Sequence, residues 1–194
     1  MQTNIIWTGK LCHSIENCLL TKTASGNEIC STIIGYYNNE IYKVDYQIKT
    51  NNNWETVFLT LRSRIDNADK SLILERKDGI WILDGMPRQE FANIFDIDIY
   101  PTPFTNTLAI NRLKLKDSER QVIEVLYFDI PEKEVKPVKQ IYTRLKEDRY
   151  LFENFDKSFK AEIKTDGQGL VVDYPELFEM KIKKESNFAI PTNS

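Results

Sequence analysis

The residues best suited to chemistry lie in the middle of the chain, in the segment 95–113. Asp96 and Asp98 alternate with apolar residues, and Arg112 lies further along in an apolar, strand-like stretch. Two residues apart on a strand, the aspartates would share one face at about 7 Å. A guanidinium among apolar neighbours needs water, an acid or a ligand head group. We therefore predict a polar site here, with Arg112 contacting one of the two aspartates.

Three roles are open to the pair Asp96 and Asp98. Both carboxylates could accept hydrogen bonds that hold the turn at residues 101–103, which is the structural interpretation and the favoured one. They could instead contact a ligand. They could also act as acid and base in glycoside cleavage, where carboxylate separations of roughly 5 to 9 Å decide the outcome. The sequence assigns no residue a catalytic role.

Short polar side chains follow the prolines of this turn, among them Thr105 and Asn106. Such side chains commonly bond neighbouring backbone groups in an irregular turn, and this interpretation is favoured. They could equally bond sugar hydroxyls. Aromatic residues pose a similar choice, because they can form an ordinary β core or line a groove for acyl chains or sugars. Those considered are Trp54, Trp81, Tyr127, Tyr142, Tyr150 and Tyr174.

The elements that would position these residues are mostly short strands. Residues 41–49 alternate between apolar and polar side chains, as a half-buried strand does. Asp78-Gly79 suits a two-residue hairpin turn. No segment of ten residues shows a convincing helical period, so even the stretch carrying Arg112 is read as strand-like. About a dozen strands predict a mainly β protein, an antiparallel β roll or partly open barrel.

The predicted organisation is one domain over residues 1–185, with a frayed tail over 186–194. Residues 131–137 carry two prolines and are interpreted as a long connection between strands. Apolar residues on both faces of segment 121–130 predict a strand covered on both sides. A single helical turn is possible within 85–92.

Composition narrows the classes of partner. The 194 residues carry a net charge of −3, with acidic and basic residues interleaved, which argues against nucleic acid. The sequence contains no signal-like N-terminus and no apolar run long enough for a membrane span, so we expect a cytoplasmic protein. Cys12, Cys18, Cys30 and the single histidine, His13, lack a metal-ligand spacing. We expect reduced thiols, no metal and no cofactor.

Two motifs carry a resemblance to a known family. The first is the segment 96–113, with its Thr-Pro-Phe-Thr-Asn-Thr-Leu run, and the second is the segment 166–178, which contains Asp173. Trp54, the turn leading to Trp81, and Tyr142 also fall in the expected order. With these motifs the chain resembles the bacterial family described as putative glycolipid-binding, a domain of unknown function. It departs from the family pattern at Asn93-Ile94, in place of Gly-Cys, and at residues 109–112, where Pro-Ile-Arg-Arg is usual.

The resemblance implies a spiral β roll that partly encloses an apolar groove and holds an amphiphile such as a glycolipid. Our leading hypothesis is therefore a binding protein for an amphipathic small molecule. The alternatives are a hydrolase acting on a glycoside or ester through Asp96 and Asp98, and a protein–protein interaction module. The ligand-contacting residues expected under the first hypothesis are Trp54, Trp81, Asp96, Asp98, Thr105, Asn106, Arg112, Tyr127, Tyr142 and Asp173.

Overall fold

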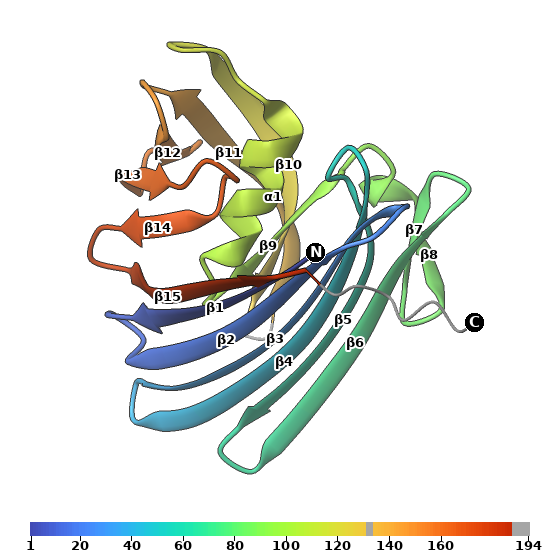
Figure 1. Cartoon of the computed structure of the whole chain (residues 1–194). Helices are drawn as coiled ribbons and strands as arrows, with labels where there is room; N and C mark the ends of the chain where they lie inside the picture. Colours follow the sequence, from blue (N-terminus) through green and yellow to red (C-terminus); the bar gives the residue numbers. More distant parts are fainter. Residues whose placement is uncertain (131–133, 188–194) are drawn as a thin grey trace, which may run out of the picture.

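The computed structural model describes residues 1–130 and 134–187, and its strands form one curled sheet (Figure 1). The first eight strands are β1 Gln2–Gly9, β2 Ser14–Lys22, β3 Gly26–Tyr37, β4 Glu40–Asn51, β5 Thr56–Ile65, β6 Ala68–Lys77, β7 Ile80–Leu83 and β8 Met86–Arg88. The 3-10 helix η1 (Gln89–Phe91), strand β9 (Asp96–Tyr100) and helix α1 (Phe104–Leu113) follow. The remaining strands are β10 Arg120–Asp129, β11 Glu134–Arg144, β12 Arg149–Asn154, β13 Lys160–Thr165, β14 Val171–Tyr174 and β15 Phe178–Ser186.

The sheet has fifteen strands in the described residues, ordered β8-β7-β6-β5-β4-β3-β2-β1-β15-β14-β13-β12-β11-β10-β9. Strands β8 and β9 are its two edges, so the sheet curls without closing into a barrel. Every neighbouring pair is antiparallel except β9 and β10, which run parallel. The predicted fold class, a mainly β roll or partly open barrel, is confirmed. The strand count exceeds the dozen expected, and one pair departs from the antiparallel prediction.

The apolar patterns of β4 and β10 in the sequence explain which of their side chains are buried. In β4 the alternating residues Tyr42, Val44, Tyr46 and Ile48 are buried, as the period of two predicts. In β10, Ile123 and Val125 belong to one apolar cluster, whereas Leu126 and Phe128 belong to another. Strand β10 is therefore covered on both faces from Val125 onward, whereas its residues 120–122 and 124 are exposed, so the prediction holds only for the second half of the strand.

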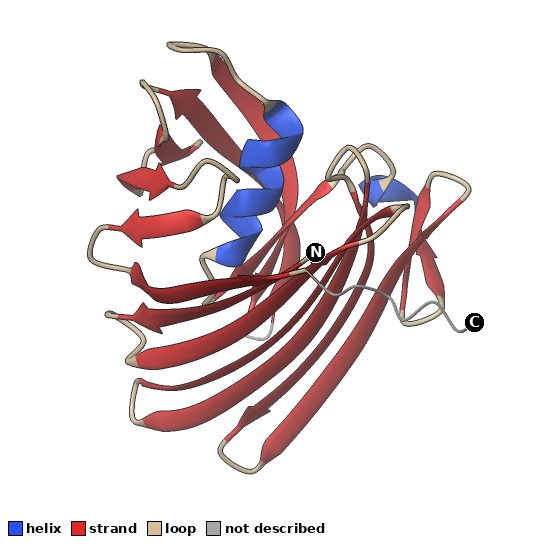
Figure 2. Ribbon diagram, in the orientation of Figure 1, coloured by secondary structure: helices blue, strands red, loops and turns tan. Residues whose placement is uncertain are grey.

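Helix α1 corrects the interpretation of residues 104–113 as strand-like. Its residues 104–110 are all buried, polar side chains included. A helix buried on every side shows no amphipathic stripe, so its period is invisible in the sequence. The helix connects the parallel strands β9 and β10, a crossover that usually needs a helix. Figure 2 shows α1 enclosed by the curve of the sheet.

Three smaller expectations met different outcomes. Strand β11 begins at Glu134, so the predicted long connection over 131–137 is wrong for residues 134–137, which pair with β10. The single helical turn expected within 85–92 is η1. Ser186, placed in the frayed tail, ends β15, and residues 188–194 of that tail lie outside the described residues. The single domain over 1–185 stays a prediction.

Two apolar clusters fill the roll. The first lies beneath β1–β7 and β9 and includes Trp7, Trp81 and Phe104. The second lies between α1 and the strands β10–β15 and includes Tyr142 and Phe152. Helix α1 contributes to both clusters, and the candidate site lies beside its first turn.

Candidate functional site

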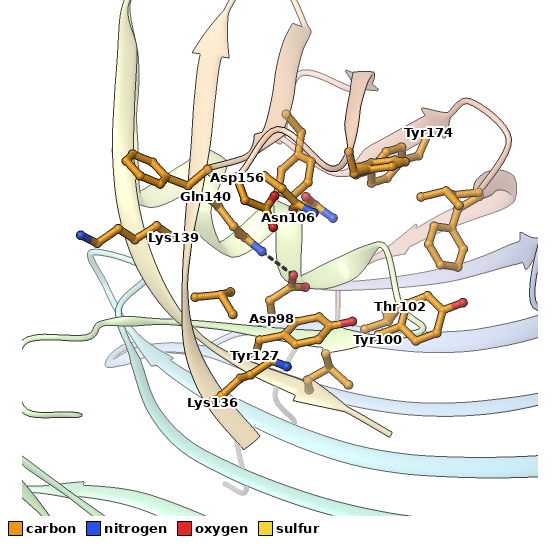
Figure 3. A pocket seen from close by; sticks show the side chains of 18 of the residues that line it. Asp98, Tyr100, Thr102, Asn106, Tyr127, Lys136, Lys139, Gln140, Asp156 and Tyr174 are labelled. Carbon is orange, nitrogen blue, oxygen red and sulfur yellow. Dashed lines mark hydrogen bonds between the residues drawn. The ribbon is translucent and has the colours of Figure 1, made fainter. Parts of the chain in front are cut away.

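A cavity of about 660 Å³ lies between the β9–α1 junction and the strands β11–β15. Ligand-binding clefts commonly measure about 300–1,000 Å³. The lining residues are Leu11, Asp98, Ile99, Tyr100, Thr102, Asn106, Tyr127, Lys136, Val138, Lys139, Gln140, Phe152, Asn154, Phe155, Asp156, Phe159, Tyr174, Leu177 and Phe178. Figure 3 shows polar side chains from β9, α1 and β11 in the same space as aromatic rings.

Asp98, in β9, is the acidic group at the centre of this cavity. Its Oδ1 accepts a hydrogen bond from Thr105 Oγ1 at 2.7 Å, and its Oδ2 accepts one from Gln140 Nε2 at 2.6 Å. Figure 3 shows the second bond as a dashed line. Burial raises the pKa of Asp98, and the two hydrogen bonds offset this only in part. The carboxyl is therefore held in a fixed orientation by two neutral donors.

Asp96, two residues earlier, is 2% exposed and makes a different contact. Arg112 donates from Nε to Oδ1 at 2.8 Å and from Nη2 to Oδ2 at 2.5 Å. Burial raises the pKa of Asp96, while the Arg112 guanidinium opposes that rise. The prediction that Arg112 contacts one of the aspartates is confirmed. Neither Asp96 nor Arg112 is among the residues that line the cavity.

Asn106, on α1, lines the cavity and is held in place by a residue outside it. Its side-chain oxygen accepts a hydrogen bond from Tyr142 Oη at 2.9 Å. Tyr142 is itself buried and does not line the cavity, and Thr105 takes a similar supporting place behind Asp98. Tyr127, on β10, does line the cavity. The structure thus brings five of the predicted ligand-contacting residues to or directly behind one space.

The remaining predicted residues lie elsewhere. Trp81 is buried in the first apolar cluster, where its Nε1 donates to the Ile94 carbonyl oxygen at 2.8 Å. Trp54 packs against the same cluster. Asp173, on β14, has a side chain that is 44% exposed and makes a 3.8 Å ion pair with Lys10. None of the three lines this cavity.

The aromatic wall of the cavity was missed by sequence reasoning. The Phe152 ring lies 6.1 Å from that of Phe159 and 6.3 Å from that of Tyr174, and Tyr174 lies 6.3 Å from Phe178. The sequence indicates Tyr174 only as one of several aromatic residues that could line a groove or form a core. These rings come from four separate strands or turns, so no local pattern joins them. Gln140 was missed for the same reason, since its partner Asp98 is 42 residues away.

A further buried carboxyl, that of Glu16 on β2, lies behind the cavity wall. It accepts hydrogen bonds from Ser31 Oγ at 2.7 Å, from Tyr46 Oη at 2.6 Å and from Thr102 Oγ1 at 2.8 Å. Burial raises its pKa to about 7. Thr102 Oγ1 also accepts a hydrogen bond from the Phe104 backbone N–H, so this network fixes the turn before α1. Thr102 lines the cavity as well.

The cysteines and the helices give no further site. Within residues 1–130 and 134–187, no three His, Cys, Asp or Glu side chains are grouped as metal ligands would be. Cys12 and Cys18 are buried and form no disulfide bond within the described residues. The Cys12 thiol forms a 2.6 Å hydrogen bond with Tyr100 Oη. Among those same residues, no helix is long and apolar enough to cross a membrane.

Two solved structures are similar to this chain. A crystal structure of a DUF1089 family protein from Pseudomonas aeruginosa is similar, with 34% identity, a TM-score of 0.75, and coverage of 84% of this chain and 91% of that one. A β-barrel-like DUF1849 protein from Brucella abortus has 8% identity and a TM-score of 0.49, over 94% and 95% of the chains. No functionally curated protein matches the chain.

The sequence pattern of the family described as "Putative glycolipid-binding" matches residues 4–180. This span contains both motifs that suggested the resemblance and all of the residues that line the cavity. The chain belongs to this putative glycolipid-binding family, whose description supports a binding role.

Proposed function

We propose that this protein binds an amphipathic small molecule, such as a glycolipid, in the cavity beside Asp98. The observation that carries the proposal is the composition of the cavity. Aromatic and aliphatic side chains from the β11–β15 half, including Phe152 and Phe159, surround a few polar groups centred on Asp98 and Gln140. Apolar walls with a few placed polar groups are typical of small-molecule sites.

The apolar part of the ligand would supply most of the binding free energy. Each buried methylene is worth about 0.8 kcal/mol, and aromatic rings offer large apolar faces for an alkyl chain. Two exposed apolar side chains, Leu11 and Phe155, also line the cavity, each 53% exposed. Exposed apolar side chains beside a cavity offer an alkyl chain an entry surface.

The polar part of the ligand would be oriented by groups that are already held in place. Asp98 is fixed by Thr105 and Gln140, and Asn106 is fixed by Tyr142. Preorganised polar groups lose little side-chain entropy on binding, so they favour one ligand orientation. The family description agrees with a ligand that has both a polar head and an apolar tail.

The test compares alkyl glucosides of different chain length on protein stripped of lipid by unfolding and refolding. Dodecyl glucoside should bind up to about 200-fold more tightly than octyl glucoside, because it buries up to four more methylenes. Glucose alone should show no measurable binding. Titration calorimetry or native mass spectrometry gives the affinities. Equal affinity for the two glucosides, or no binding of either, would contradict the proposal.

A matched pair of variants localises the site. Phe155→Ser removes an exposed ring at the cavity, whereas Ile41→Ser removes a side chain on β4 that is 65% exposed and does not line the cavity. Surface changes of this kind alter stability by about 0.5 kcal/mol or less. Phe155→Ser should weaken dodecyl glucoside binding several-fold, and Ile41→Ser should leave it unchanged. Equal effects of both variants would place the ligand elsewhere.

No specific observation favours the hydrolase or the protein-interaction alternative. Of the pair Asp96 and Asp98, only Asp98 lines the cavity, and both oxygens of Asp96 accept hydrogen bonds from Arg112. The binding function is therefore the single function proposed.

A further inference from the structure

Asp98 is a carboxyl group in a ligand-sized cavity without a cationic partner. It makes no ion pair with any lysine or arginine of residues 1–130 and 134–187. Asp96, on the same strand, has two hydrogen bonds from Arg112. Asp98 is partly buried, and a carboxylate withdrawn from water is costly unless a cation or several donors compensate for its lost hydration. Asp98 has only two neutral donors.

The geometry leaves each oxygen of Asp98 able to accept another hydrogen bond. A carboxylate offers about four acceptor positions. Thr105 occupies one on Oδ1 and Gln140 occupies one on Oδ2. Because Asp98 lines the cavity, a molecule inside it can reach the remaining positions.

Each of the two lysines that line the same cavity contacts a group other than Asp98. Lys136 Nζ lies 2.5 Å from Glu134 Oε2, and Lys139 Nζ lies 5.6 Å from the centre of the Phe155 ring. Figure 3 shows the Lys139 side chain extending away from Asp98. The other acidic residue lining the cavity, Asp156, is exposed and bonds the backbone and hydroxyl of Ser158. A negative group beside Asp98 would therefore meet an acid, and neither lysine that lines the cavity makes an ion pair with Asp98.

We propose that the head group of the bound amphiphile carries a protonated amine, which forms the missing ion pair with Asp98. This inference rests on the proposed function and names the chemical class of its ligand. An ammonium donates up to three hydrogen bonds, and charge-assisted bonds to a carboxylate are about twice as strong as neutral ones. The amine belongs either to an amino sugar or directly to the lipid, and the experiment separates these sources.

The experiment compares probes with one dodecyl chain and different heads, each below its micelle concentration at pH 7. The central pair is dodecyl glucoside and dodecyl glucosaminide, which differ by one hydroxyl replaced with an amine. Dodecylamine tests an amine without a sugar, and dodecanoate tests an anionic head. At least one amine should bind about 10- to 100-fold more tightly than both dodecyl glucoside and dodecanoate.

The pattern of preference identifies the source of the amine. A preference for the glucosaminide alone indicates an amino sugar, and a preference for dodecylamine alone indicates a lipid amine. Either result supports the proposal. If neither amine exceeds dodecyl glucoside, the proposal is overturned. If no dodecyl probe binds at all, the proposed function itself fails, so the two failures are distinguishable.

Asp98→Asn and Asp156→Asn form the matched variants. Asp98→Asn should lower affinity for the preferred amine about 10-fold or more, and this loss should exceed the loss for dodecyl glucoside, whose head carries no charge to pair with Asp98. Asp156→Asn removes an exposed charge at the same cavity and should change amine affinity less than threefold. An equal loss for all probes in Asp98→Asn would contradict the proposal. Should that variant fail to fold, the preference of the unaltered protein still decides the question.

Discussion

Asp96 and Asp98 lie two residues apart on one strand and have different environments. Asp96 is buried against Arg112, which donates to both of its oxygens. Asp98 accepts from two neutral side chains and faces a cavity. The difference arises from what packs opposite each residue, since the local sequence is nearly the same. An ion pair of this kind holds helix α1 to β9, whereas an unpaired acid is available to a ligand.

Glu16 extends the comparison to a third carboxyl, which is 2% exposed. Within the residues that the structure describes it makes no ion pair either, and three hydroxyl groups surround it in place of a ligand-accessible space. Cavity access therefore distinguishes Asp98 from Glu16, and the absence of a cation distinguishes both from Asp96. The following predictions separate the three situations by their effect on stability.

Arg112→Ala should have the largest effect. Removing one partner of a buried ion pair leaves the other charge uncompensated, which costs about 3–5 kcal/mol in the free energy of unfolding. Urea unfolding at pH 7 measures the loss. The control is Arg88→Ala, which removes an ion pair with Glu90 whose side chains are 36% and 55% exposed. That control should cost less than about 1 kcal/mol. Comparable losses in both variants would show that the pair with Asp96 is no more important than a surface contact.

Glu16 should make the protein less stable as pH rises. Its pKa is about 7 in the folded protein, above the ordinary value of 4.5. A raised pKa means that the folded state binds the proton more tightly, so this contribution is complete below pH 4.5 and is lost as pH rises through 7. The loss amounts to about 3 kcal/mol.

Comparing the unaltered protein with the variant Glu16→Gln separates the contribution of Glu16 from those of other carboxyl groups. Glu16→Gln removes the titration, so the difference in unfolding free energy between the two proteins should change with pH across this window. Relative to the unaltered protein, Glu16→Gln should gain stability between pH 4.5 and 8. A difference that stays constant over that range would refute the assignment.

The smallest effect is expected from replacing the two aspartates themselves. Asp96→Asn weakens the charge-assisted bonds from Arg112 and should cost about 2 kcal/mol. Asp98→Asn keeps a side-chain oxygen that can accept from Thr105 and removes a charge that burial disfavours, so it should cost less than about 1 kcal/mol. Thermal or urea unfolding of both variants at pH 7 gives the ranking. The reverse order would mean that Asp98 has the greater structural role.

Local patterns were enough to predict much of the sheet. The alternation in β4 and the two apolar faces of β10 follow from side-chain period alone. Arg112 was expected to find an acid because an unpaired guanidinium among apolar residues is costly. These inferences depend on one residue and its near neighbours, which the sequence displays directly.

The remaining features depend on contacts between distant segments. Helix α1 is buried on all sides, so its sequence lacks the polar stripe that identifies most helices. The Glu16 network joins β2 to Thr102 across 86 residues. In the same way, Gln140 reaches Asp98 only because a single strand, β10, separates β11 from β9 in the sheet.

The sequence by itself determined the β character of the protein, most strand positions, the family and the pairing of Arg112 with an acid. Tertiary structure alone decided which aspartate receives that arginine and which faces the cavity. The physical reason is that strand alternation fixes a side chain's face, whereas its partner is set by how the sheet curls. Residues from β9, α1 and β11–β15 meet around one space only after that curl has formed.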